Sequence, residues 1–467
     1  MNCIKNIWIL GLVILFVSCE PSFDEFAPSK GEADFSSFVA IGDSYTAGYT
    51  DGALGAEGQK YSFVNIMAQQ FKTVGGGEFK QPLTAEGKSV GTTTIDAQGN
   101  KNGFFKLSVT ASTASGLKPV PTAGDMSIFT TSVALQSPFN NMGVPGAKSI
   151  HLVTPGFGNP AAGQGKFNPF FTRMASNPVS TTVLGDALLT EPTFFSLWIG
   201  GNDVLWYALA GGEAVNGGFG SDDITPLDNF NGAIDLILNS LSTGGATKGV
   251  MANIPDINAL PYFTTVPYNA LKLDQTSADA LNAGYAQYNL AANAASLPAI
   301  VFVAGYNPFV IADPEYALGF RQIKSTEKVL LSLPTDKISG TEKWGSMTPI
   351  PISYILDESE LANIRTTTAA FNTSLKAKAD AKGLAFVDIF ALMNEIVLGK
   401  QFDGFKYSST FVSGGMFSLD GIHATNRGSA IIANEFIKAI NAKYGANVPV
   451  VNINDYKTVI FPEKPQQ

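Results

Sequence analysis

The feature that most constrains the fold is a repeated alternation of short apolar segments with longer segments of helical periodicity. The apolar segments are rich in β-branched and aromatic residues and end at glycine or polar turn residues, as buried strands do. They cover residues 35–41, 193–199, 249–253, 300–304 and 384–389, and the helical segments cover 61–71, 227–241, 277–295, 358–382 and 427–444. This order predicts a mostly parallel sheet covered on both faces, a three-layer α/β/α sandwich.

Two long segments do not follow the alternation. Residues 74–138 are rich in Gly, Thr and Ser, with turn signals at Gly99-Asn100 and Asn102-Gly103 just before the apolar run 104–107. This pattern predicts an inserted β-hairpin. Residues 313–356 contain several Pro and Gly and show little periodicity. Both are interpreted as surface insertions, of the kind that shape a binding site when they lie near strand ends.

Composition narrows the classes of partner. At 467 residues and 45% hydrophobic content, the chain has ample material for a buried core. Acidic residues outnumber basic ones by 39 to 30, giving a net charge of -9. No run of Lys or Arg forms a stripe that would neutralise a phosphate backbone, so nucleic acid is not expected as a partner.

The N-terminus has the pattern of a secretory signal: Lys5 is followed by an apolar stretch, 7–17, too short to span a bilayer comfortably. It closes on Ser18-Cys19, which resembles the lipobox of bacterial lipoproteins, where the Cys is lipidated and becomes the new N-terminus. Only one other Cys exists, inside the signal itself. Ordinary cleavage near Ser18, leaving Cys19 as a free thiol, is the alternative.

These patterns predict the organisation of the chain. We expect a signal peptide at 1–18, a flexible tether at 19–33 after a lipidated Cys19, one catalytic-type domain at 34–446 and a C-terminal tail at 447–467. The expected location is the bacterial cell envelope, with the protein anchored to the outer membrane or cell surface through its lipid.

Ser44 follows the first predicted strand directly, in Gly42-Asp43-Ser44. Glycine permits a sharp turn there, which can lift a hydroxyl into a cleft at the carboxyl end of the sheet. Taken alone, the signal is weak, because a Ser in this position is more often a helix N-cap than a nucleophile.

Asn202 follows the second predicted strand, in Gly200-Gly201-Asn202-Asp203. A side-chain N–H at this place can point at an oxyanion that develops during acyl transfer. The alternative is an ordinary turn of Gly, Asn and Asp.

Asp420 and His423 lie just before the last predicted helix. A three-residue separation across a turn lets the carboxylate reach the imidazole Nδ1, which turns Nε2 toward a nucleophile. The chain has only two His, and the other, His151, has no carboxylate within four residues. His423 is therefore the favoured general base, and His151 is interpreted as structural.

Four neighbouring side chains are expected to have structural roles. Asp43 and Asp203 are expected to satisfy backbone N–H groups of turns, and Trp198 and Trp206 to form core or cleft wall. No metal or organic cofactor is expected, since no cluster of His, Cys and acidic residues has ligand spacing.

Taken together, Gly42-Asp43-Ser44, the segment 141–146 (NMGVPG), Gly200 to Asp203 and Asp420 to His423 resemble, in order, the four blocks of the SGNH (GDSL) hydrolase superfamily. The resemblance covers about 35–444. Tyr45 stands where the four-letter name has Leu, and the stretch between the first two blocks is much longer than is typical.

The resemblance implies an SGNH/flavodoxin-like fold and an acyl-transfer mechanism. Ser44 would be the nucleophile and His423, oriented by Asp420, the base. The backbone N–H groups of Ser44 and Gly146 and the side chain of Asn202 would form the oxyanion hole.

Two functions remain open. The first is a carboxylester hydrolase, either a lipase or acylhydrolase or an acetylesterase, acting on a small-molecule, lipid or acylated-glycan ester; Phe-rich segments such as 167–171 favour an acyl pocket only slightly. The second is a catalytically silent surface lipoprotein that binds a glycan or lipid on the same fold.

Overall fold

The computed structural model describes residues 27–95, 99–109, 117–213, 220–242 and 247–461. The predicted signal peptide, the lipidation site Cys19 and the first part of the tether lie outside the described residues, so these three expectations stay predictions.

A five-stranded parallel sheet forms the centre of the molecule and confirms the predicted fold class. Its spatial order is β15-β8-β7-β1-β6, and every neighbouring pair is parallel. If the five strands are numbered 1 to 5 in chain order and read from β6 to β15, their order is 2-1-3-4-5, which is the arrangement of flavodoxin-like sheets. The bounds are β1 Phe38–Gly42, β6 Asn141–Gly143, β7 Phe194–Trp198, β8 Lys248–Ala252 and β15 Ala385–Val387.

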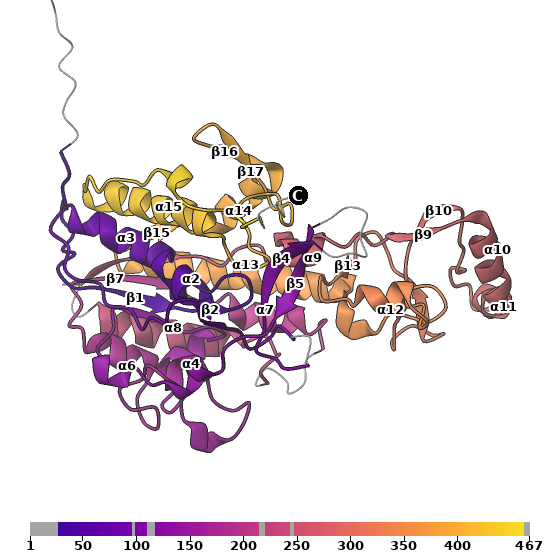
Figure 1. The fold of residues 1–467 in the computed structure, drawn as a ribbon, viewed down its shortest axis with the longest axis horizontal. Helices are drawn as coiled ribbons and strands as arrows, with labels where there is room; N and C mark the ends of the chain where they lie inside the picture. The colour runs from indigo at the N-terminus through magenta and orange to yellow at the C-terminus, as the bar shows by residue number, and fades with distance from the viewer. Residues whose placement is uncertain (1–26, 96–98, 110–116, 214–219, 243–246, 462–467) are drawn as a thin grey trace, which may run out of the picture.

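Helices cover both faces of this sheet (Figure 1). On one face lie α3 (Phe63–Lys72) and α15 (Asn426–Tyr444), which contact each other. The other face carries α6 (Val183–Leu188), α8 (Leu227–Leu241) and α13 (Glu358–Ala381). Side-chain caps define several of these helices: the Thr425 hydroxyl accepts from the Gly428 N–H at the start of α15, and Asp357 forms a capping box at the start of α13.

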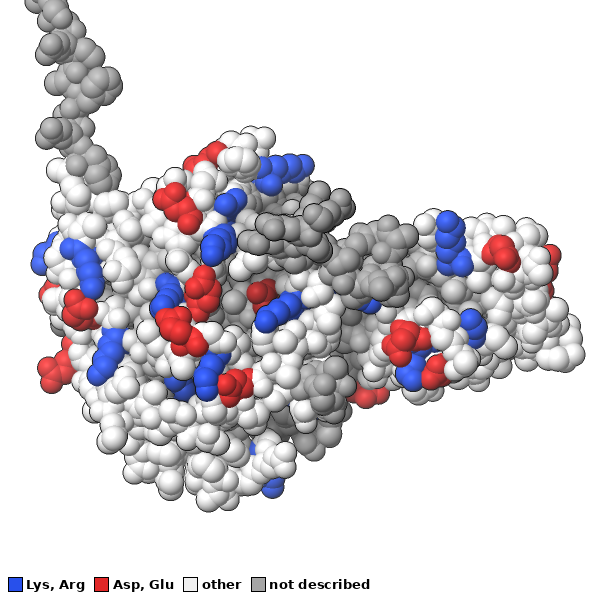
Figure 2. All heavy atoms as spheres, viewed as in Figure 1, with Lys and Arg blue, Asp and Glu red and all other residues white. Residues whose placement is uncertain are grey.

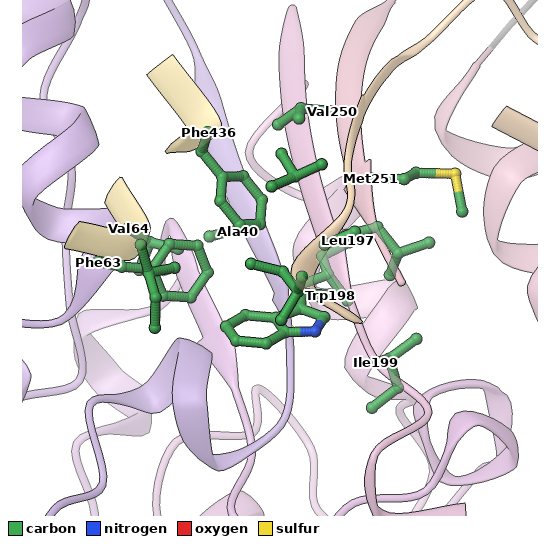
Figure 3. Close-up of a cluster of buried hydrophobic side chains, with 14 of the residues drawn as sticks. Ala40, Phe63, Val64, Leu197, Trp198, Ile199, Val250, Met251 and Phe436 are labelled. Atoms are coloured by element: carbon green, nitrogen blue, oxygen red, sulfur yellow. The ribbon is translucent and has the colours of Figure 1, made fainter. Parts of the chain in front are cut away.

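The main core lies between the sheet and these helices. On the face toward α3 and α15, the indole of Trp198 packs against Phe63 and Phe436, with ring centroids 5.4 Å and 6.0 Å away (Figure 3). On the opposite face, Phe230 of α8 stacks on Phe371 of α13 at 4.0 Å. The period-2 alternation of side chains along each strand supplies both layers at once.

One part of the predicted alternation is wrong. Residues 300–304 form no strand, and the single helix predicted at 277–295 is two helices, α10 (Gln275–Gly284) and α11 (Ala286–Ala294). Short apolar runs are ambiguous by periodicity alone. Ile300 and Phe302 are buried, but in a second core rather than in the central sheet.

This second core builds a lobe that projects away from the sheet (Figure 1). The lobe takes in the predicted insertion 313–356 and the residues before it. Its other elements are α9 Pro261–Thr264, β9 Leu271–Leu273, β10 Gly305–Asn307, β11 Val310–Ala312, β12 Phe320–Gln322, β13 Lys328–Val329, α12 Thr335–Ser339 and β14 Ile355–Leu356. The strands pair as short antiparallel ribbons, β9 with β10, β11 with β12 and β13 with β14.

The β-hairpin predicted within 74–138 is present, and the turn signals at 99–103 precede its first strand. Strand β4 (Phe104–Val109) pairs antiparallel with β5 (Leu117–Thr122), so the apolar run 104–107 belongs to the first strand of the hairpin. Gly103, the last residue of the turn signals, forms an isolated antiparallel bridge with Thr94. Other small elements within or near this region are α1 Ser44–Ala47, β2 Leu54–Gly55, α2 Ala56–Lys60, β3 Ser89–Val90, α4 Ser127–Thr130 and α5 Pro169–Thr172.

Both described ends of the chain lie against the domain. The Glu32 N–H donates to the Tyr444 carbonyl at 2.9 Å, and Ser29 pairs with Asn447 in an isolated bridge. The segment expected as a tail then returns along α15, where the Asn434 amide donates to the Val451 carbonyl at 2.9 Å. The end of the predicted tether and the start of the tail are thus held together.

The surface in Figure 2 carries Lys and Arg interspersed with Asp and Glu, without a continuous basic stripe on the face shown. Among the described residues, no helix has both the length and the apolar character needed to cross a membrane.

Candidate active site

Three of the predicted blocks meet at the carboxyl edge of the sheet. Ser44 follows β1, the segment 144–147 follows β6 and Asn202 follows β7, and β1 lies between β6 and β7. In this strand order the chain switches sides of the sheet next to β1, and the crevice that results is where open α/β sheets bind ligands. Sequence order and sheet order together therefore place the three blocks around one crevice.

Ser44, His423 and Asp420 form one hydrogen-bonded row. His423 Nε2 lies 2.8 Å from Ser44 Oγ, and His423 Nδ1 lies 2.8 Å from Asp420 Oδ2. All three are buried, with exposed fractions of 8% each. The spacing of three residues between Asp420 and His423 gives the local pairing that the sequence predicted.

The carboxylate of Asp420 is held by donors besides the imidazole. Oδ1 accepts the N–H groups of Ile422 and His423, both at 2.8 Å, and the hydroxyl of Ser418 at 3.1 Å; Oδ2 also accepts the Gly52 N–H at 2.8 Å. Burial raises the pKa of Asp420, but His423 and these hydrogen bonds outweigh burial and leave the pKa at about 2. Asp420 is therefore ionised throughout the working range of an enzyme.

Two tyrosines pack on the imidazole. The ring centroid of Tyr49 lies 4.8 Å from that of His423, and the ring centroid of Tyr45 lies 5.3 Å away. The Tyr45 hydroxyl donates to the Ile422 carbonyl and the Tyr49 hydroxyl to the Gly52 carbonyl. Tyr45, which replaces the Leu of the family name, therefore anchors the loop that carries His423.

The turn that presents Ser44 depends on its neighbours. A Cβ on Gly42 would lie 2.4 Å from the Trp198 carbonyl oxygen, so only glycine fits between the two strands. The Asp43 carboxylate accepts the Tyr45 N–H at 3.1 Å and caps the short helix α1, as the sequence predicted. Burial raises the pKa of Asp43 to about 7.

Asn202 and Gly146 line one pocket together with Ser44. Asn202 Nδ2 donates to the Ala147 carbonyl at 3.0 Å, which ties the start of α7 (Asn202–Leu209) to the loop after β6. Gly146 has φ +79, a left-handed conformation that suits glycine, and its carbonyl accepts from Trp206 Nε1 at 3.3 Å. Within the described part of the chain, the Gly146 N–H donates no hydrogen bond.

The remaining predicted residues have structural roles. His151 stacks on Phe157 at 4.4 Å and accepts the Lys148 N–H through Nδ1, away from the row of Ser44. Burial, aided by the Lys148 charge, lowers the pKa of His151 to about 4. Asp203 satisfies a distant backbone rather than its own turn, since it accepts both the N–H and the hydroxyl of Ser149, at 2.8 and 2.7 Å.

Small pockets open on the two sides of the nucleophile. One, of about 30 Å³, is lined by Ser44, Trp198 and apolar residues that include Ile257 and Leu260. The other, of about 60 Å³, is lined by Ser44, Gly146 and Trp206 together with threonines of the first insertion. Trp198 and Trp206 thus form the core and cleft wall that the sequence predicted. The Phe-rich segment 167–171 lines neither pocket, and Phe170 and Phe171 are core residues.

Several residues of the site were missed in the sequence. Gly52, Tyr49 and Ser418 contact Asp420 or His423, although the first two lie far from them in the chain. The dipeptide Asp51-Gly52 is a turn signal. It predicts the turn but not which distant carboxylate the turn supports.

No group of three or more His, Cys, Asp and Glu residues in the described part of the chain is arranged to hold a metal ion. The site's polar groups are instead a hydroxyl, an imidazole, a carboxylate and amide N–H donors, the set used in acyl transfer.

No curated protein matches. Two solved structures with similarity are mutants of Axe2 from Geobacillus stearothermophilus. One is described as an acetyl-xylooligosaccharide esterase, with 10% identity, 88% of this chain and 96% of that chain covered and a TM-score of 0.32. The other, an acetylxylan esterase, has 10% identity, coverage of 89% and 96% and a TM-score of 0.31.

The family comparison is decisive. The model for GDSL-like Lipase/Acylhydrolase matches residues 38–436, most of the chain and all four blocks. The chain belongs to the GDSL-like lipase/acylhydrolase family and is a hydrolase that acts on ester bonds.

Proposed function

We propose that the protein is a serine esterase that forms an acyl-enzyme on Ser44. The observation that carries the proposal is the continuous row from Ser44 Oγ through both nitrogens of His423 to Asp420 Oδ2, with 2.8 Å at each step. With Nδ1–H donating to the Asp420 carboxylate, the lone pair of Nε2 faces the serine hydroxyl.

The proposed cycle has two halves. Ser44 Oγ attacks the ester carbonyl carbon while His423 Nε2 takes the hydroxyl proton, and the same proton then passes to the departing alcohol. Water, deprotonated by His423, attacks the acyl carbon; the bond to Ser44 Oγ then breaks, His423 returns the proton to Oγ, and the carboxylic acid leaves. Asp420, ionised because its pKa is about 2, stabilises the imidazolium formed in each half.

The developing oxyanion is proposed to lie among the N–H groups of Ser44 and Gly146 and the Asn202 amide. The Asn202 amide has two N–H groups, of which Ala147 takes one, and the residue lines both small pockets beside Ser44. Donors fixed by the fold before reaction cost no reorganisation during it, which is why such sites stabilise transition states.

The small size of both pockets favours a short acyl group. An apolar cavity of about 150 Å³ binds benzene, whereas the pockets beside Ser44 measure about 30 and 60 Å³. An acetyl methyl fits such a space and a long aliphatic chain does not. We therefore propose an acetylesterase rather than a lipase.

A p-nitrophenyl ester series tests this preference. We expect soluble protein lacking residues 1–19 to cleave the acetate best, with kcat/KM falling steadily through butyrate and octanoate to palmitate, because longer chains clash with the pocket walls. Initial rates at 405 nm give the series.

A preference for octanoate or longer would contradict the short-acyl proposal. The variant Leu260→Ala, which enlarges the 30 Å³ pocket, is the matched test of the wall and should move the preference toward butyrate. Silence of the wild type toward every ester would return weight to the binding-protein alternative.

We also propose that the chain is a lipoprotein anchored through Cys19. The position of the described N-terminal residues suits a substrate outside the anchoring bilayer. Glu32 and Ala33 precede β1, whereas Ser44 lies beyond its carboxyl end, so the described part of the chain enters the domain at the edge opposite the crevice. Substrates in the aqueous phase or on glycans then reach Ser44 more directly than lipids of the same membrane.

Replacing Cys19 tests the anchor. We expect the wild-type full chain, expressed in a Gram-negative host, to incorporate a labelled fatty acid and sediment with membranes. Cys19→Ala should lose the label and leave the membrane pellet, because two or three acyl chains are needed for stable attachment. An unlabelled, soluble wild-type protein would instead support ordinary signal cleavage.

A further inference from the structure

A pocket close to the site does not open on Ser44. It has a volume of about 320 Å³, within the size range of ligand pockets. Five separate segments line it: the loop and helix at 50–58, Ser89 of β3, strand β4, the segment 418–426 at the start of α15 and residues 458–460. None of its lining residues lines either pocket beside Ser44, so it cannot hold the acyl group of a bound ester.

One wall of this rear pocket is apolar and partly aromatic. Phe105 packs with Leu107, Leu419 and Val459 in a small cluster of its own, separate from the main core. Its ring also lies against the loop, since a Cβ on Gly52 would be 3.2 Å from it. The wall therefore offers an aromatic surface supported from behind.

The other side of the rear pocket is polar. It includes Asp51, Ser418, Thr50, Thr425 and Asn426. The Asp51 carboxylate accepts the Leu419 N–H at 2.9 Å through Oδ1. Its Oδ2 has no hydrogen-bond donor among the described residues, and burial raises its pKa to about 6. A ligand with hydroxyl groups would supply the missing donor.

We propose that the rear pocket binds a sugar unit of a neutral glycan. The apolar C–H face of a pyranose ring stacks on an aromatic ring, while its hydroxyls donate to a carboxylate and exchange hydrogen bonds with Ser and Thr. A fatty acid fits less well, because two carboxylates, Asp51 and Glu57, line the pocket against the single cation Lys106, and a long acyl chain has no use for the polar lining groups. The pocket thus adds a carbohydrate-binding site beside the esterase site.

The rear pocket also contacts the support of the proposed catalytic acid. The Asp51 N–H donates to Ser418 Oγ at 3.0 Å, and the Ser418 hydroxyl donates to Asp420 Oδ1 at 3.1 Å. The Phe105 N–H donates to the Asp51 carbonyl at 2.7 Å, which fixes the hairpin to the same loop. A sugar that fills the pocket would touch groups one hydrogen bond away from Asp420.

Calorimetric titration of the Ser44→Ala protein with xylohexaose, cellohexaose and mannohexaose tests the proposal without any ester chemistry. We expect at least one of the three to bind with a Kd in or below the millimolar range. Phe105→Ala should weaken that binding by about tenfold or more, since it removes the stacking surface. Asp51→Asn, which keeps the oxygen that accepts from Leu419, should weaken it by a smaller factor.

Two controls locate the binding. Phe405→Ala removes an exposed aromatic ring outside the pocket and should leave the Kd unchanged. Trp206→Ala changes the wall of the esterase crevice and should also leave it unchanged. Absence of binding by all three oligosaccharides would overturn the proposal, as would binding that Trp206→Ala abolishes and Phe105→Ala does not. Because no ester is cleaved, these results stand apart from the test of the esterase function.

Discussion

Replacing Ser44 with Ala is expected to lower kcat/KM for p-nitrophenyl acetate by at least about 10⁴-fold, and His423→Ala by a similar factor. The hydroxyl oxygen is the proposed nucleophile, and Nε2, 2.8 Å away, is the base that activates it. The double variant should be no slower than either single one, because the two groups act as a unit. Initial rates with each purified variant measure the effect.

The controls separate chemistry from folding. Ser196→Ala removes a hydroxyl that is equally well buried in β7 and should keep activity within about threefold of the wild type. Circular dichroism melting of all variants checks that each is folded. Activity retained by folded Ser44→Ala would refute the acyl-enzyme proposal, and a burst of p-nitrophenol in the wild type, absent from this variant, would support it directly.

Most of the central fold was predictable because its signals are local. A buried strand between two layers of helices is apolar along its whole length, and the runs 193–199 and 249–253 match β7 and β8 to within a residue or two. The helical periodicity of 358–382 also matches α13, Glu358–Ala381, to within one residue.

The second lobe was not predictable in the same way. The run 300–304 is as apolar as a sheet strand, yet Ile300 and Phe302 point into a separate core. Whether an apolar segment joins the main sheet depends on which distant residues cover it, and periodicity carries no information on that. Strand β6 was missed because it has only three residues, Asn141–Gly143, which are too few to show a periodic pattern.

In the candidate site, too, local pairings were predictable and long-range contacts were not. Asp420 and His423 could be paired from the sequence because three residues separate them, and joint presence with Ser44 and Asn202 made each more specific. The supporting contacts from Gly52 and Tyr49 depend on how the loop after α1 folds back over the C-terminal block. These contacts join residues more than 350 positions apart in the case of Gly52 and Asp420, and no local signal marks them.

Replacing Asn202 with Ala is expected to lower kcat by about 10²- to 10³-fold, equivalent to about 3 to 4 kcal/mol, with little change in KM. The asymmetry follows from the proposed role. The amide donates to an oxygen that is fully charged only in the tetrahedral state, so its loss weakens transition-state binding more than substrate binding. Full kinetic curves with p-nitrophenyl acetate measure both parameters.

Asn253→Ala is the matched control, because Asn253 also follows a strand of the central sheet, β8. Its Nδ2 donates to Asp388 Oδ1 at 2.7 Å, and its Oδ1 accepts the Phe390 N–H. The substitution should lower the melting temperature and leave kcat nearly unchanged. Asn202 also holds the Ala147 carbonyl, so its removal can shift the loop that carries Gly146. A loss confined to kcat indicates a missing oxyanion donor, whereas an equal rise in KM would assign Asn202 to the shape of the crevice instead.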